Sequence, residues 1–166
     1  MKRRELLTGL AAATLVSGCT SQAPSRVHPS QAHYGSPVPL PSPDATGTIS
    51  LEKAIGKRRS LRAFRPDPLP TATIGQLLWA GRGVTSPDGK RAAPSAGALY
   101  PLELYVVTPG QVMHYLPDGH RAQTRAVSDL RPGLKAAAVG QSTVGPGPVV
   151  IMVAAVPSRL SHRCGD

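Results

Sequence analysis

An arginine-rich segment offers the first chemistry in this sequence. Arg58, Arg59, Ser60 and Arg62 place three guanidiniums and one hydroxyl within five consecutive residues. Guanidiniums donate forked pairs of hydrogen bonds that match phosphate oxygens. If a helix ends near Ser60 and the chain then runs extended, Ser60 and Arg62 point the same way and Arg58 reaches the same anion from the last helical turn. The alternative is a solvated basic helix end, which the helix dipole favours.

A run of small residues is the second candidate. Pro94, Ser95, Ala96, Gly97 and Ala98 come shortly before a strongly apolar segment. Small side chains let the backbone approach a flat ligand closely and expose its N–H groups to it. The alternative is a tight loop that only leads into a strand.

The patterns around these two segments predict helices and strands in irregular alternation. Ser50 suits the N-cap of a helix ending near residue 60, and Thr71 or Thr73 suits that of a second helix ended by Gly81 and Gly83. Further elements are predicted at 102–107, 112–116, 120–124 and 149–156 as strands and at 129–139 as a short helix. The continuous apolar run 149–156 suggests a central strand buried on both faces. Without a regular βαβ rhythm, the α+β class fits best.

Taken together at this separation, the two segments resemble the flavin mononucleotide (FMN) dependent nitroreductase family. The nearest branch is similar to the SagB-type dehydrogenases, which oxidise azoline rings in peptides. The stretches that support the resemblance are 50–55, 76–80, 83–85 and 98–107. It implies a nitroreductase-like mixed sheet flanked by helices.

Carried over by position, the resemblance also implies a cofactor site. Contacts with the FMN phosphate, ribityl chain and pyrimidine edge fall to Arg58, Arg59, Ser60 and Arg62. Contacts with the isoalloxazine ring fall to Pro94, Ser95, Ala96, Gly97 and Ala98. Many nitroreductases carry polar amides where this chain has Ala98 and Tyr100, a departure that fits the SagB-type branch.

The chemistry implied is hydride transfer through the flavin N5, with the protein setting orientation and electronics. The electron donor would be NAD(P)H, or the substrate itself in a dehydrogenase, and the substrate a small molecule or peptide. No residue is assigned as a catalytic acid or base.

The resemblance covers about residues 50–166 and corresponds to the N-terminal half of a family member. We therefore expect either a homodimer or a complementing C-terminal chain. The apolar run 149–156 is expected to lose a packing partner and leave apolar surface exposed.

The N-terminus has the features of an export signal. A basic start, Lys2 to Arg4, precedes an apolar run at 6–16 that is shorter than the roughly 20 residues of a membrane span. The run ends in Leu-Val-Ser-Gly before Cys19, which resembles a bacterial lipobox. We predict a signal peptide over 1–18, lipidation at Cys19, a Pro- and Ser-rich tether over 19–47 without helix or strand, and the nitroreductase-like domain over 48–166. The location would be the bacterial cell envelope, outside the cytoplasm and anchored in the membrane by lipid. Arg3 and Arg4 leave twin-arginine export open beside a general secretory signal.

Composition argues against several other functions. The net charge of +10 invites nucleic-acid binding, but aromatic residues make up only 4% of the chain, too few for a base-stacking platform. Five histidines are scattered without metal-ligand spacing, so no metal site is predicted. The main rival is a truncated lipoprotein fragment that holds no flavin and is either inactive or binds a partner.

Overall fold

The computed structural model describes residues 34–160. The predicted signal peptide and the lipidation site at Cys19 lie outside the described residues. Within them, no helix is both long and apolar enough to cross a lipid bilayer.

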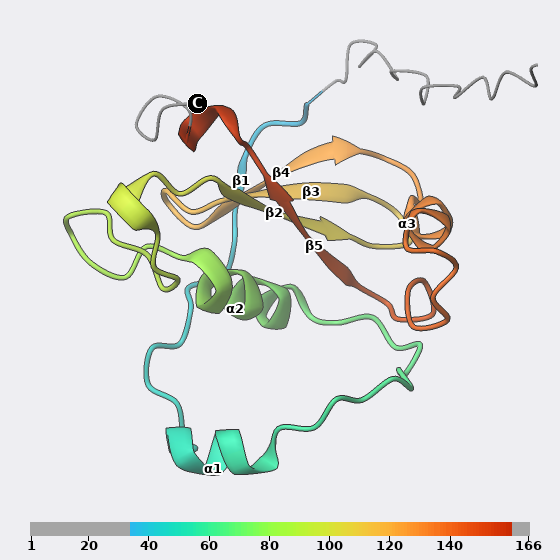
Figure 1. Cartoon of the computed structure of the whole chain (residues 1–166), viewed down its shortest axis with the longest axis horizontal. Coiled ribbons are helices and arrows are strands. Elements are labelled where there is room, and N and C mark those ends of the chain that lie inside the picture. Colours follow the sequence, from blue (N-terminus) through green and yellow to red (C-terminus); the bar gives the residue numbers. More distant parts are fainter. Residues whose placement is uncertain (1–33, 161–166) are drawn as a thin grey trace, which may run out of the picture. The chain divides into compact units, whose positions relative to one another are not determined.

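Five strands form one sheet in the order β1-β4-β3-β2-β5 (Figure 1). They are β1 (Val38–Pro39), β2 (Leu102–Val107), β3 (Val112–Leu116), β4 (Arg121–Ala126) and β5 (Val150–Ala155). Every pairing between them is antiparallel, whereas we predicted a mixed sheet. The α+β class is confirmed, with helices α1 (Leu51–Lys57), α2 (Thr71–Arg82) and α3 (Arg131–Ala137) and a short 3-10 turn, η1 (Ala96–Ala98).

Residues 117–119 form the turn of the hairpin that joins β3 and β4. Gly119 has a φ of 75°, a left-handed conformation that glycine adopts without strain. His120 follows at a φ of 48°, and its N–H donates to the carbonyl of Pro117 at 3.0 Å. The Tyr115 hydroxyl lies 2.9 Å from Nδ1 of His120, so the turn is tied to the core.

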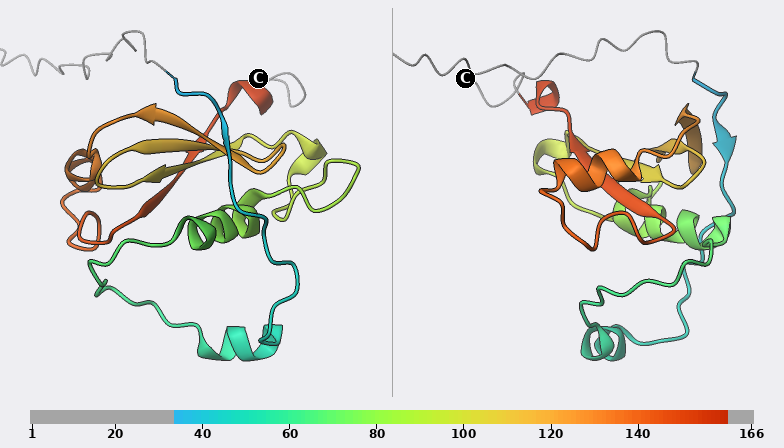
Figure 2. Two further views of the ribbon diagram at one scale, coloured as in Figure 1. Left: turned by 180° about the vertical axis from the view of Figure 1, so that it is seen from behind. Right: turned by 90° about the vertical axis from the view of Figure 1, so that its right-hand side faces the viewer.

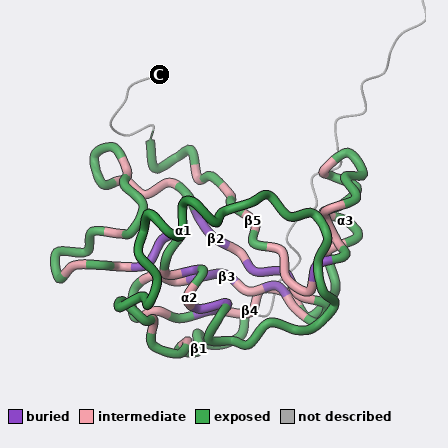
Figure 3. Tube along the Cα trace, turned by 90° about the horizontal axis from the view of Figure 1, so that it is seen from below, coloured by how far each residue is buried: buried purple, intermediate pink, exposed green. Residues whose placement is uncertain are grey.

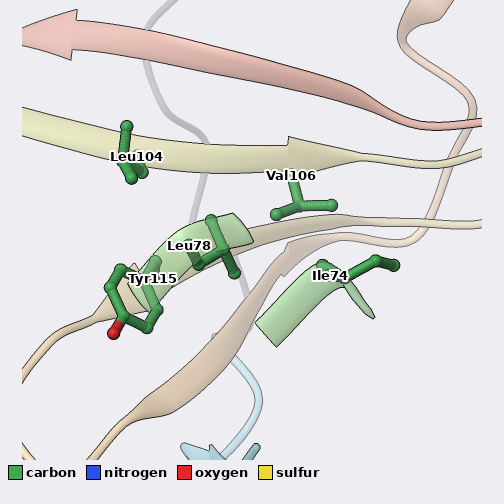
Figure 4. Packing of buried hydrophobic residues seen from close by; sticks show 5 residues of the cluster. All are labelled: Ile74, Leu78, Leu104, Val106 and Tyr115. Atoms are coloured by element: carbon green, nitrogen blue, oxygen red, sulfur yellow. The ribbon is translucent and has the colours of Figure 1, made fainter. Parts of the chain in front are cut away.

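Helix α2 covers one face of the sheet and supplies two of the five buried residues of the core cluster (Figures 1 and 4). Ile74 and Leu78 pack against Leu104, Val106 and Tyr115. The helix begins at Thr71, with Pro70 rather than a threonine at the N-cap. No side chain caps this end, and the Pro70 carbonyl accepts the first helical hydrogen bond, from the N–H of Ile74 at 3.1 Å. Its end at Gly83 is confirmed as predicted.

The start of the domain differs from the predicted boundary. Val38 and Pro39, which we placed in a strand-free tether, pair with Ala122 and Arg121. The next residue, Leu40, packs against the core and donates its N–H to the carbonyl of His120 at 2.9 Å. Part of the proline-rich segment therefore forms an edge strand. Proline is tolerated there because its missing N–H removes no hydrogen bond from the sheet.

Strand β5 forms where a strand was predicted, but its predicted central position is wrong. It pairs with β2 on one side and is an edge strand of the described sheet. Alternate residues are exposed, with Val153 58% exposed and Ile151 37%. The expected apolar exposure of this run is therefore confirmed.

Helix α1 stands apart from the core (Figures 1 and 2). Ser50 caps it as predicted, because its Oγ accepts a hydrogen bond from the N–H of Lys53 at 3.3 Å. Its residues, and those of the extended segment 58–70, are all exposed (Figure 3). The apolar side chains of Leu51 and Ile55 therefore have no packing partner in the described chain.

Candidate cofactor site

The loop before β2 holds its shape through hydrogen bonds within itself. The N–H of Tyr100 donates to Ser95 Oγ at 2.9 Å, and the N–H of Ala98 donates to the Ser95 carbonyl at 3.0 Å. Three of its residues are left-handed, with φ of 60° at Gly97, 54° at Ala98 and 45° at Tyr100. Such values cost a residue with a Cβ free energy. Strain of this kind is typical of functional loops and suits a backbone shaped for a ligand.

An apolar pocket of 420 Å³ opens beside this loop. Pro94 and Ser95 form one wall, and Leu104 and Val153 of the two paired strands form another. The volume lies within the range of roughly 300–1,000 Å³ that small-molecule sites occupy. A planar, mainly apolar ring system fits the chemistry of this lining.

The arginine segment begins at the end of α1, where Arg58 is the C-cap. Its hydrogen bonds are local: Arg58 Nη1 donates to Ser60 Oγ at 3.4 Å, and Arg59 Nη1 donates to the carbonyls of Gly56 at 3.0 Å and Arg58 at 2.8 Å. No acidic side chain in the described part of the chain pairs with these guanidiniums. They remain available to an external anion.

The structure does not bring the two predicted motifs together within one chain. None of Arg58, Arg59, Ser60 and Arg62 lines a pocket that the loop lines. Their neighbours Leu61 and Phe64 instead line a separate groove of 660 Å³. The views in Figures 1 and 2 place α1 and η1 in different parts of the domain. The FMN site made of both motifs stays a prediction.

A buried ionic network, which the sequence analysis missed, lies behind the loop. Glu103 at the start of β2 is contacted by three cationic or titratable groups. Oε2 lies 3.0 Å from Arg82 Nη1 and 2.7 Å from His114 Nε2, and Oε1 pairs with Arg159. The Arg82 contact has the distance of an ion pair without the alignment of a hydrogen bond.

Burial and pairing compete in setting the charge states of this network. Burial raises the pKa of Glu103, but hydrogen bonds from His114 and Arg159 and the charge of Arg82 outweigh it, so the net pKa is lowered. Burial lowers the pKa of Arg82, and the Glu103 carboxylate opposes that change. The carboxylate is therefore ionised at neutral pH.

The same network anchors the loop. Arg82 Nη2 and Arg159 Nη1 each donate to the carbonyl of Tyr100 at 2.8 Å. The guanidinium of Arg91 lies over the Tyr100 ring, 4.4 Å from its centroid, a cation–π contact. The left-handed conformation of Tyr100 is thus held by two charge-assisted hydrogen bonds and a ring contact.

Comparison with known proteins identifies the family. A sequence model of a protein family, described as "Nitroreductase family", matches residues 55–163. This stretch includes the arginine segment, the loop and the buried network. The chain belongs to the nitroreductase family.

Relatives of this nitroreductase-family chain agree in name and in fold; each is named "putative nitroreductase". One from Methanocaldococcus jannaschii is 35% identical over 125 residues, covering 71% of this chain and 63% of the relative. A crystal structure from Ralstonia eutropha matches with a TM-score of 0.69 and 30% identity, covering 78% of this chain and 60% of the other. One from Anabaena variabilis matches with a TM-score of 0.51 and 30% identity, covering 56% and 22%. The chain thus spans about three fifths of the length of the first two relatives.

One feature of this chain's sequence could have indicated the buried network around Glu103. Glu103 interrupts the apolar strand 102–107, and a charge there is rarely buried without a partner. Its partners Arg82, His114 and Arg159 lie on other elements, so only the fold names them. Among residues 34–160, no three His, Cys, Asp or Glu side chains gather as a metal site requires.

Proposed function

We propose that the chain forms part of an FMN-dependent oxidoreductase. The observation that carries this proposal is the strained loop 94–100 beside an apolar pocket in a chain of the nitroreductase family. When bound, the flavin supplies hydride acceptance and donation at its N5 atom.

The chain's own residues have distinct tasks in this proposal. The loop from Pro94 to Ala98 would lie against the ring system, with Leu104 and Val153 excluding water from one side of the pocket. The side chains of Arg58 and Arg62 would bind the phosphate. Arg82 and Glu103 do not touch the flavin in this account; they hold the loop through the Tyr100 carbonyl.

A second copy of the chain, or a complementing chain, is proposed to complete the site. Two observations support this: the loop and the arginine segment share no pocket within one chain, and the arginine segment is flanked by exposed apolar residues. Leu61 is 75% exposed and Phe64 is 49% exposed. Contact with another copy would bury this apolar surface and bring guanidiniums of one copy near the loop of the other.

The finer assignments rest on the sequence. The SagB-type branch would make the substrate a ring-bearing peptide or small molecule, and NAD(P)H a candidate electron donor. Export and lipidation at Cys19 would place the enzyme at the outer side of a bacterial membrane.

The test is flavin retention by the full chain. We expect the purified protein, mixed with FMN and desalted, to keep a yellow chromophore absorbing in the visible range. The double variant Arg58→Ala and Arg62→Ala should lose it, because the phosphate loses its forked donors. Arg65→Ala, an exposed arginine of the same extended segment, is the matched control and should keep it.

A rival function predicts a different spectrum. A flavin-free fragment that binds a partner is favoured by the exposed apolar side chains of Leu61 and Phe64. It predicts a folded, colourless wild-type chain after FMN addition. Equal retention by the double variant and its control would instead remove the arginines from the site.

A further inference from the structure

A second pocket, of 440 Å³, shares Tyr100 and Arg82 with the apolar pocket and is lined by arginines from four parts of the chain. They are Arg82 at the end of α2, Arg91 before the loop, Arg121 at the start of β4, and Arg159 after β5. Two carboxylates, Glu103 and Asp118, also line it. Four guanidiniums against two carboxylates leave an excess of two positive charges.

The pairing within this pocket is uneven. Glu103 is fully engaged by Arg82, Arg159 and His114. Arg121 donates from Nε to the backbone carbonyl of Asp118 at 3.2 Å and has no ion pair with a described carboxylate. Its charge remains available to an anion in the pocket.

Arg91 carries the clearest imbalance. Its Nε and Nη1 are buried and have no hydrogen-bond acceptor within residues 34–160. Its guanidinium contacts the Tyr100 ring, but no described carboxylate pairs with it. Buried N–H donors without an acceptor cost free energy, which an anion accepting their hydrogen bonds would recover. The excess positive charge also affects Arg82. Burial is the largest cause of its lowered pKa, and the positive charges of Arg91 and Arg159 lower that pKa further, whereas the Glu103 carboxylate raises it.

We propose that this pocket binds the phosphate group of a small phosphorylated molecule, at a site separate from the arginines at 58–62. A phosphate dianion matches the two excess positive charges, and arginine forks suit its oxygens. The pocket is larger than a phosphate requires, so it also accepts part of the molecule that carries the phosphate. Because Ala98 and Leu99 line it too, this molecule lies at the end of the loop that the proposed function assigns to the flavin.

Calorimetric titration of the full chain with inorganic phosphate at pH 7.5 tests the site, with sodium chloride at matched ionic strength as the reference. Arg121→Gln should weaken phosphate binding about fivefold, because one positive charge near the anion is lost. Asp118→Asn should tighten it by a similar factor, because one negative charge is lost while the turn keeps a compatible residue. Arg65→Gln is the matched control and should leave the affinity unchanged.

Opposite shifts in the two pocket variants separate a local site from general charge attraction. If Arg121→Gln and Asp118→Asn both bind phosphate as Arg65→Gln does, or phosphate produces no heat beyond chloride, the proposal is wrong. A fall in affinity with Arg58→Gln and Arg62→Gln, but not with Arg121→Gln, would move the phosphate to the other cluster and also overturn it.

A competition arm distinguishes this site from the flavin site. Phosphate binding that persists with unchanged affinity in the FMN-saturated chain supports a second ligand. Competition between FMN and phosphate, relieved by Arg121→Gln, would show that the pocket takes the flavin's own phosphate and would overturn the separate site. If the chain retains no flavin but binds phosphate with the predicted variant pattern, the proposed function fails while this inference stands.

Discussion

At the scale of single residues, Glu103 determines how the loop is held. It is buried, and its carboxylate neutralises Arg82 and Arg159, which in turn hold the carbonyl of Tyr100. Removing one partner of a buried ionic network leaves the others uncompensated. The network is therefore expected to affect both stability and the shape of the loop.

Glu103→Gln should lower the free energy of unfolding by about 3 kcal/mol, because two guanidiniums lose their buried counter-charge. Urea denaturation followed by circular dichroism measures it. Asp67→Asn, at an exposed carboxylate, is the matched control and should change the free energy by less than about 0.5 kcal/mol. Equal values for the two variants would contradict a structural role for the buried carboxylate.

The pH dependence follows from the direction of the pKa shift. The pKa of folded Glu103 lies below its ordinary value of 4.5, so the unfolded chain binds the proton more tightly. The stabilisation is present above that value and is lost as the pH falls through the lower folded pKa. The transition should fall between about pH 5 and about pH 3. Over this window, the unfolding free energy of wild type should fall more steeply than that of Glu103→Gln. Parallel curves would show that this carboxylate does not titrate differently in the folded chain.

At the scale of elements, helix α2 is the part that fixes the domain's core. Leu78 is 0% exposed at its centre, whereas the adjacent Leu77 is 47% exposed. Leu78→Ala should lower the unfolding free energy by about 3 kcal/mol through lost burial and a residual cavity. Leu77→Ala, the same change one position away, should cost less than about 1 kcal/mol. Similar losses in the two variants would mean that the helix packs on a different face.

The bounds of helices and strands could be predicted from the sequence more accurately than the positions of the strands within the sheet. β2 and β3 were placed at their observed bounds because alternation and turn residues act over a few positions. β5 was predicted as a strand, but its position in the sheet was predicted wrongly. An apolar run alone does not distinguish a central strand from an edge strand whose outer side is exposed. Val38 and Pro39 were missed because two residues carry no periodicity.

The candidate site divides in the same way. A loop at 94–98 was predicted from its small residues, because they favour a tight chain path over a regular element. The left-handed conformations of Ala98 and Tyr100 were not predicted, because their side chains give no local reason for them. The Glu103 network could not be predicted, since Arg82 and Arg159 come from distant positions that only the folded sheet brings together. The joint flavin site of the arginine segment and the loop stays a prediction; within the described chain the two segments line different pockets.

At the scale of the whole molecule, the proposed assembly rests on exposed apolar surface and on guanidiniums that have no acidic partner among the described residues. Phe64, Leu61 and the edge of β5 are exposed on the described chain, and the arginines at 58–62 have no acidic partner there. An assembly of two copies would bury apolar area and join each arginine segment to a loop of the other copy. This is the central claim, because the proposed flavin site depends on it.

Mixing two defective variants tests that claim most directly. One carries Arg58→Ala and Arg62→Ala; the other carries Gly97→Val, which puts a branched side chain at a φ of 60° and disrupts the loop. Each alone should lose the FMN that wild type retains. After unfolding and refolding together, mixed assemblies should regain visible flavin absorbance, because each contains one site with an intact arginine segment and an intact loop. A mixture that remains as colourless as its two components, beside a yellow wild type treated in the same way, would contradict a site shared between copies.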